Sequence, residues 1–202
     1  MRKTKEDALV TKEKILDAAL QVFIEKGYSQ TSLEDVVNRL SMTRGAFYWH
    51  YKDKGDLLRQ LILREHAFIS ELAAGEYKDG DTEREKLEKM ILNWVISFYD
   101  NQRYRDYVYL VRFRIEFDSV SDYLKDLTGL NEYIIKEVEK ILRSAVRKRE
   151  LSESSDPKSA AVHLVLLLDG MFRLYFAVPK YLSKKKTAVK IVRDYIELLF
   201  KK

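Results

Sequence analysis

Apolar residues recur at helical spacing along nearly the whole chain. In the segment 8–26, Ile15, Ala19, Val22 and Phe23 fall three or four residues apart, and this spacing places side chains on one face of an α-helix. The pattern predicts two short helices within about 32–51 and six longer helices at about 54–74, 82–100, 103–117, 120–149, 157–178 and 187–200. We therefore expect an all-α chain of about nine helices.

Capping residues mark where several of these helices begin. Thr31-x-x-Glu34 and Thr82-x-x-Glu85 have the spacing of a capping box, in which each side chain binds a free backbone N–H of the first helical turn. Asp156 precedes a proline at the first helical position, a common helix start. With only two prolines and seven glycines in the chain, long uninterrupted helices are favoured.

The segment 42–54 carries the most specific chemistry. Its sequence, Met-Thr-Arg-Gly-Ala-Phe-Tyr-Trp-His-Tyr-Lys-Asp-Lys, surrounds the small apolar stripe of Ala46 and Phe47 with hydroxyl, guanidinium, phenol and imidazole groups. Such a helix suits the DNA major groove, where arginine reads guanine edges and hydroxyl groups reach phosphates. Together with the short helix before it and the tight turn at 40–42, it predicts a helix-turn-helix at about 32–51. Asp53 is the expected N-cap of the helix that follows.

The segment 43–54, with Asp56-Leu57-Leu58 after it, closely resembles the recognition region of TetR-family repressors. The resemblance begins at Arg2-Lys3-Thr4-Lys5 and Ile15-Leu16-Asp17-Ala18-Ala19. It continues through Ile115-Glu116-Phe117 and Leu168-Asp169-Gly170-Met171, which are similar to the AcrR/TtgR branch, whose members repress multidrug efflux pump genes. The match therefore spans most of the chain.

This resemblance implies a fold and a function. It implies a homeodomain-like, three-helix DNA-binding domain at residues 1–54, followed by a helical ligand-binding and dimerisation domain at 55–202. The implied function is a ligand-responsive transcriptional repressor that binds a palindromic operator as a homodimer, is released by a small lipophilic or cationic effector, and controls efflux genes. The family dimerises through its last two helices, here 157–178 and 187–200. Its turn usually carries glycine, so we expect mild backbone strain at Ser41.

The expected DNA contacts lie in the N-terminal quarter of the chain. Arg44 is expected to read base edges, whereas Thr43, Tyr48, His50 and Lys54 are expected to contact mainly phosphates. The basic N-terminal residues are either an arm that binds DNA or a solvated, frayed terminus. The full set of expected DNA-binding residues is Arg2, Lys3, Thr31, Ser32, Thr43, Arg44, Gly45, Tyr48, His50 and Lys54.

Aromatic residues gather in the middle and later helices, where they predict a ligand cavity. Drug-sized molecules bind apolar pockets with a few placed polar groups, although for each single aromatic residue a place in the core is the alternative. In the AcrR/TtgR branch the positions that match His66 and Asp169 face the cavity. The expected ligand-binding residues are His66, Trp94, Phe98, Tyr109, Arg112, Phe113, Glu116, Asp169, Phe172 and Phe176.

Asp169 interrupts the strongly apolar 157–178 helix. An unpaired carboxylate is costly in apolar surroundings, so Asp169 needs a partner. The partner is either a cationic ligand, Arg173 one turn later, or Arg112 or Arg114 of a neighbouring helix. The sequence alone leaves these alternatives open.

Composition restricts the remaining function classes. The net charge of +5 weakly favours a polyanionic partner. The near-neutral balance of residues 1–54, only +2, disfavours a sequence-nonspecific architectural DNA-binding protein, an alternative that competition against bulk DNA tests. The absence of cysteine excludes disulfide bridges and cysteine-based metal sites.

Catalytic and membrane functions also find little support. The histidines at 50, 66 and 163 lie in three different helices without a metal-binding motif. We therefore expect no catalytic residue, no metal and no cofactor, and an enzyme that uses the C-terminal pocket is the remote alternative. No apolar run is judged long and charge-free enough to span a bilayer, so we expect a cytoplasmic protein without a membrane partner.

Overall fold

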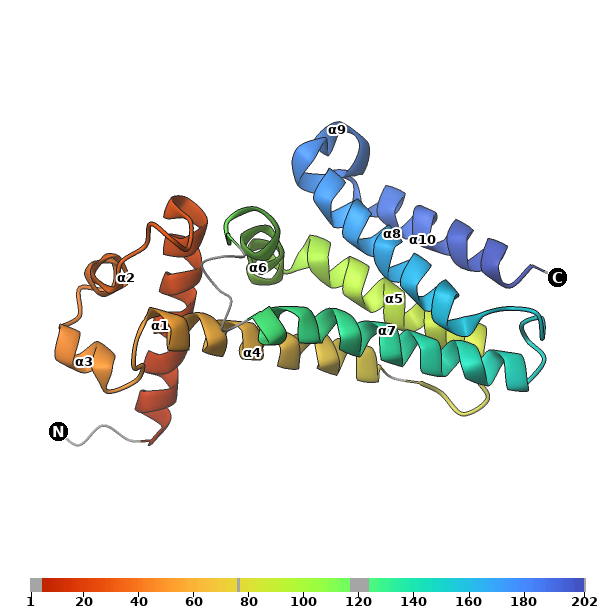
Figure 1. Cartoon of the computed structure of the whole chain (residues 1–202), viewed down its shortest axis with the longest axis horizontal. Helices are drawn as coiled ribbons and strands as arrows, with labels where there is room; N and C mark the ends of the chain where they lie inside the picture. Colours follow the sequence, from red (N-terminus) through yellow and green to blue (C-terminus); the bar gives the residue numbers. More distant parts are fainter. Residues whose placement is uncertain (1–4, 76, 117–123, 202) are drawn as a thin grey trace. The chain divides into compact units, whose positions relative to one another are not determined.

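The computed structural model describes residues 5–75, 77–116 and 124–201. Within these residues it contains ten α-helices and no strand, which confirms the all-α prediction (Figure 1). The chain divides into two compact units, formed by residues 1–66 with 103–127 and by residues 67–102 with 128–202. The boundary expected near residue 54 remains a prediction.

The first unit contains the helices at the N-terminus and one later helix. Its elements are α1 (Lys5–Lys26), α2 (Leu33–Arg39), α3 (Arg44–Tyr48), the first half of α4 (Lys54–Ala74) and α6 (Gln102–Phe113). The apolar stripe of α1 is buried as the spacing predicts, because Ile15, Ala19, Val22 and Phe23 all lie in the core. Val36 of α2 and Phe47 of α3 are fully buried too, so each short helix contributes an apolar anchor.

The expected capping box at Thr31 and Glu34 is wrong. Ser32 is the N-cap of α2: its hydroxyl accepts a hydrogen bond from the Asp35 N–H at 3.3 Å, and the Asp35 carboxylate accepts one from the Ser32 N–H at 2.9 Å. Thr31 is instead buried and donates its hydroxyl to the Gly27 carbonyl at 2.7 Å. The tertiary packing of Thr31 against the end of α1 thus moves the helix start by one residue.

The other predicted caps are confirmed. Thr82 and Glu85 form a capping box at the start of α5 (Glu83–Asp100). The Asp53 carboxylate accepts a hydrogen bond from the Asp56 N–H at 2.8 Å, and Asp156 caps α8 (Pro157–Ala177). Ser41 has a φ of 49°, the left-handed backbone that its sequence position predicted.

The second unit is built from longer helices. It contains the rest of α4, α5, most of α7 (Leu124–Arg147), α8, the short α9 (Pro179–Leu182) and α10 (Lys185–Leu199). The sequence prediction lacked α9, and the helix start expected near residue 120 lies outside the described residues. Helix α10 packs against α5, where Arg193 Nε donates to Glu88 Oε1 at 2.9 Å.

The expectation that no segment is long and apolar enough to cross a bilayer is wrong for α8. By length and composition alone it passes that test, with a mean hydropathy of 1.5 over its most apolar window. The signal is weak because core helices of soluble proteins have the same composition, and only 28% of that window is buried within the structure. Leu166 and Leu174 are among the exposed residues of this helix, so α8 presents an apolar face that needs an explanation.

Candidate nucleic-acid interface

Helix α3 is a five-residue helix that combines one buried anchor with an exposed polar face. The hydroxyl of Thr43 accepts a hydrogen bond from the Ala46 N–H at 3.2 Å and so caps the helix. Phe47 is fully buried, whereas Arg44 and Tyr48 are exposed on the other side. The cap and the anchor together fix a helix too short to be stable by itself.

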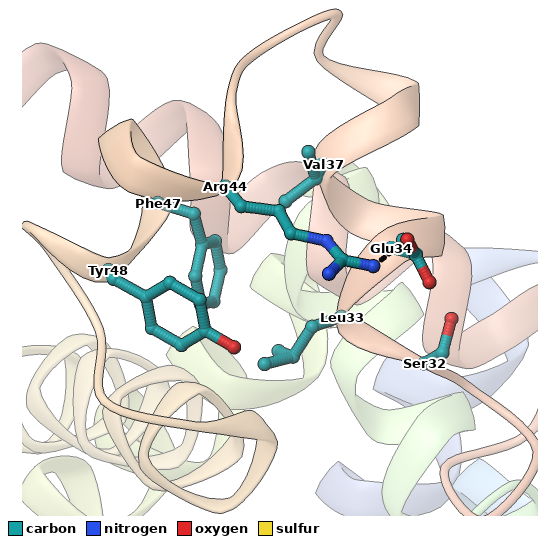
Figure 2. Close-up of a pocket in the computed structure, with 7 residues that line it drawn as sticks. All are labelled: Ser32, Leu33, Glu34, Val37, Arg44, Phe47 and Tyr48. Carbon is teal, nitrogen blue, oxygen red and sulfur yellow. Dashed lines mark hydrogen bonds and ion pairs between the residues drawn. The ribbon is translucent and has the colours of Figure 1, made fainter.

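A shallow groove of about 270 Å³ lies between α2 and α3. In it the guanidinium of Arg44 reaches across to the carboxylate of Glu34 on α2 and forms an ion pair (Figure 2). The Tyr48 hydroxyl points into the same groove, above Leu33 (Figure 2). Arg44 and Glu34 both remain largely exposed, so this pair orients the guanidinium at the surface without burying it. The groove is lined by Ser32, Leu33, Glu34, Val37, Arg44, Phe47 and Tyr48.

Two residues beyond α3 show roles that the sequence analysis did not anticipate. Trp49 is 72% exposed, an unusual place for an indole, and it lies beside the α3 surface. Tyr51 is buried, its hydroxyl donates to the Lys12 carbonyl of α1 at 3.1 Å, and burial raises the pKa of this phenol. The helical spacing of Phe47 and Tyr51, with Tyr48 and Trp49 between them, was the available sequence signal for both roles.

Lys54 makes internal contacts in place of the open position expected for a phosphate ligand. Its ammonium donates to the carbonyls of Tyr28, Ser29 and Thr31 at 3.0, 3.3 and 2.9 Å. It also lies 4.6 Å from the centre of the Tyr28 ring. Burial lowers the pKa of Lys54. The ammonium therefore holds the turn between α1 and α2.

The remaining expected DNA contacts fall into three groups. Thr43 and Gly45 are exposed beside Arg44, and His50 is half-buried after α3. Thr31 and Ser32 are occupied by the start of α2, Thr31 inside the core and Ser32 as its cap. Arg2 and Lys3 lie outside the described residues. The role of each in DNA binding stays a prediction.

The expected ligand-binding residues are divided between the two units. In the first unit, His66 Nε2 is buried with no hydrogen-bond partner among the described residues, and burial lowers the pKa of this imidazole. Phe113 is exposed and its ring centre lies 5.4 Å from that of Tyr109. Arg112 is half-buried on the same helix, and Glu116 accepts a hydrogen bond from Ser29.

In the second unit the expected ligand-binding aromatics pack on one another. Phe98 is fully buried, with its ring stacked on Phe172 at 4.3 Å and in edge-to-face contact with Phe176 at 5.8 Å. Trp94 is also buried and donates its indole N–H to the Ile69 carbonyl at 3.1 Å. Asp169 is half-buried on α8. These aromatics form core in the structure, and their contact with a ligand stays a prediction.

A buried carboxylate on α4 was missed by the sequence analysis. Glu65 has no exposed surface, and its Oε1 lies 3.0 Å from Arg64 Nε and 3.4 Å from Arg103 Nε. Burial raises the pKa of Glu65, opposed by the two guanidinium groups. Its position among the leucines of α4 was a possible signal, but the partner from α6 was not visible in the sequence. No group of three potential metal ligands occurs in the part of the chain that the structure describes.

Comparisons with known proteins agree with this architecture. A family model described as bacterial regulatory proteins, tetR family, matches residues 15–61. The transcriptional regulator AcrR of Shigella flexneri is 29% identical over 204 residues, which cover 98% of this chain and 91% of AcrR. The family model thus covers the segment that holds α2 and α3, and the similarity to AcrR covers nearly the whole chain.

Solved structures extend the comparison. NalD, the secondary repressor of the MexAB-OprM multidrug efflux pump in Pseudomonas aeruginosa, superimposes with a TM-score of 0.80 at 25% identity, over 95% of this chain and 96% of NalD. SmeT, the repressor of the Stenotrophomonas maltophilia efflux pump SmeDEF, has been solved as a complex with triclosan. That complex has a TM-score of 0.77 at 28% identity, over 94% of this chain and 91% of SmeT.

Proposed function

Because this chain belongs to the TetR family of bacterial transcriptional regulators, we propose that it represses transcription as a homodimer on a palindromic operator. A small lipophilic or cationic effector releases it from DNA. The observation that carries this proposal is the α3 surface, a side-chain-capped helix that presents Arg44 and Tyr48 beside a groove. A twofold dimer would place two such helices one or more DNA turns apart.

Each exposed group of α3 has a role in this proposal. Arg44 reads a guanine edge, because the bidentate contact of arginine with guanine is the most common specific contact in the major groove. Thr43, Tyr48 and His50 contact phosphates and fix the register. We assign Lys54 to the support of the α1–α2 turn, since its ammonium already binds three carbonyls.

The apolar face of α8 and the end of α10 form the proposed dimer surface. Leu166, Leu174 and Leu198 are exposed on these helices, and large exposed apolar patches commonly mark protein interfaces. A second copy of the chain explains this surface better than a bilayer, because Asp169 and Arg173 lie within the same helix. We therefore propose a cytoplasmic protein without a membrane partner.

The proposed effector is drug-like. NalD and SmeT are named repressors of multidrug efflux pumps, and SmeT binds triclosan. By analogy, this chain controls an efflux gene and responds to a lipophilic or cationic compound, and His66 in the first unit and Asp169 in the second unit are each proposed to influence this response. AcrR is named a regulator, so catalysis is no part of the proposed function, and neither a metal nor a cofactor is needed.

The DNA-binding role is tested by Arg44→Ala on an operator fragment selected with the wild-type protein. We expect a loss of about 1–3 kcal/mol of discrimination between operator and random DNA, as for one bidentate base contact. Lys52→Ala is the matched control, since Lys52 is an exposed cation four residues from Tyr48. It should weaken both DNAs equally. Equal losses on both DNAs for Arg44→Ala would make Arg44 a phosphate contact and overturn its assignment.

The effector role is tested by His66→Ala and Asp169→Ala, with triclosan and tetraphenylphosphonium as probes. Both variants should bind the operator as the wild type does, while the concentration of probe that releases DNA changes by about fivefold or more. Unchanged release by both probes in both variants contradicts a role of either residue in the effector response.

A further inference from the structure

The segment directly after α6 binds the C-terminal end of α1. Arg114 Nε donates to the Ile24 carbonyl at 2.7 Å, and Arg114 Nη2 donates to the Glu25 carbonyl at 2.6 Å. Both carbonyls belong to the last turn of α1, where helix geometry leaves acceptors without intrahelical partners. A cation at this position is also favoured by the helix dipole. One side chain thus caps a helix that lies 90 residues away in sequence from it.

The backbone makes the same connection. The Tyr28 N–H donates to the Arg114 carbonyl at 2.9 Å, so Tyr28 does not continue the α1 hydrogen-bond pattern to Ile24. Glu116 accepts a hydrogen bond from the Ser29 hydroxyl at 2.7 Å. Gly27, with a φ of 83°, brings the chain close enough that an added Cβ would lie 3.8 Å from the Arg114 carbonyl. Residues 114–116 therefore contact the α1–α2 turn through side chains and backbone.

The same turn is also bound by the start of α4, through the Lys54 ammonium. Helix α2 begins directly after this turn, and its Glu34 carries the ion pair that orients Arg44. A displacement of residues 114–116 would consequently move the turn, then α2, and then the guanidinium of α3. All of these contacts lie within the first unit.

We propose that residues 114–116 act as a clamp that positions the helix-turn-helix and transmits the state of α6 to it. Arg114 is a positioning residue: it contacts no DNA but holds the α1–α2 turn in the arrangement that binds the operator. Tyr109 and Phe113, predicted ligand contacts, lie on α6 shortly before Arg114, so an effector that displaces α6 weakens the clamp. This inference rests on the proposed repressor function for its effect on DNA, although the clamp itself is testable without DNA.

The clamp is tested by hydrogen exchange at the Tyr28 amide. Arg114→Ala leaves the residue-114 carbonyl in place, so the Tyr28 N–H loses protection only when the segment leaves the turn. We expect exchange at residues 24–31 to become about tenfold faster or more, while α8 and α10 keep their wild-type protection. Arg114→Lys should restore part of the protection. Ser29→Ala, an exposed turn substitution, should produce a smaller change of the same kind.

The positioning role is tested with the same variants on the selected operator. Arg114→Ala should lower operator affinity by about tenfold and random-DNA affinity much less, because misplaced recognition helices lose register but not charge attraction. Arg84→Ala, which removes an exposed arginine from the second unit, is the control for charge and should change neither the exchange nor the discrimination.

The outcomes separate the clamp from the repressor proposal. Unchanged Tyr28 exchange in Arg114→Ala overturns the clamp, whatever DNA binding does. Faster exchange with wild-type operator affinity and wild-type effector response overturns its positioning role. A wild-type protein that selects no DNA sequence overturns the repressor function and this positioning role with it, while the exchange measurement still decides whether the clamp exists.

Discussion

The α2–α3 pair and the α8–α10 pair hold their structure by different means. Helices α2 and α3 have seven and five residues, and their order comes from side-chain caps at Ser32 and Thr43 and from the buried ring of Phe47. Helices α8 and α10 have 21 and 15 residues and rely on apolar area. The small polar surface is positioned by hydrogen bonds, whereas the broad apolar surface is proposed to be covered by a second copy of the chain.

The largest effect is expected in the aromatic core of the second unit. Phe98→Ala removes a fully buried ring that contacts Phe172 and Phe176, and we expect a loss of about 3–5 kcal/mol in the free energy of unfolding. Phe113→Ala in the first unit is the matched control, because that ring is exposed, and should cost below about 1 kcal/mol. Urea denaturation measures both. Equal losses would contradict the contrast between a core ring and a surface ring.

The next effect concerns the surface of α8. Leu166→Glu places a charge at a leucine that is 63% exposed and is proposed to be covered in the dimer, so the dimer dissociation constant should rise about a hundredfold or more, or ~2.7 kcal/mol. Leu9→Glu on α1 is the control: this leucine is 64% exposed, and its substitution should leave the dimer dissociation constant unchanged. Analytical ultracentrifugation measures the dissociation constants of both variants. An unchanged dissociation constant in Leu166→Glu would show that Leu166 of α8 is not part of the dimer interface.

A smaller effect distinguishes the two possible caps of α2. Ser32→Ala removes the observed N-cap and should cost about 1 kcal/mol of stability. Glu34→Ala, which removes the side chain expected from the sequence to complete the box, should cost below about 0.5 kcal/mol, because that side chain makes a surface ion pair instead. Thermal unfolding measures the loss of stability in each variant. A larger loss for the Glu34 variant than for the Ser32 variant would support the capping box at Thr31 instead.

The smallest effect is a pH dependence at the same cap. The Lys26 ammonium, with hydrogen bonds from Ser32, lowers the pKa of Asp35 from its ordinary value of 3.8 to about 2. Because the folded state favours the ionised carboxylate, its stabilisation is complete above about pH 5 and is lost as the pH falls through 3.8 towards 2. Asp35→Asn should flatten this part of the stability profile. If Asp35→Asn shows the same dependence of stability on pH as the wild type, Asp35 is excluded as its source.

Local patterns were sufficient where the interaction is local. The helix periodicity of α1 and the caps at Thr82, Asp53 and Asp156 join residues two to four positions apart, and all were predicted. The cap of α2 was missed because Thr31-x-x-Glu34 and Ser32-x-x-Asp35 have the same spacing. Only the burial of Thr31 against α1 distinguishes the two registers.

Contacts between distant residues were beyond the sequence. Nothing near Arg114 in sequence indicates that it caps α1, and nothing near Lys54 shows that its ammonium binds three carbonyls of a turn more than 20 residues earlier. The same holds for Glu65, whose partner Arg103 lies on another helix. For this reason the residues of α3 that are proposed to face DNA could be named from a motif, whereas the contacts that hold the α1–α2 turn required the fold.

The most direct test of the repressor account is selection of bound fragments from random and promoter-region DNA with the purified wild-type protein. We expect enrichment of one palindrome whose half-sites lie one or more helical turns apart, bound by two protomers or by a pair of dimers. Weak, strongly salt-dependent binding without a consensus sequence would contradict it and favour a nonspecific DNA-binding protein.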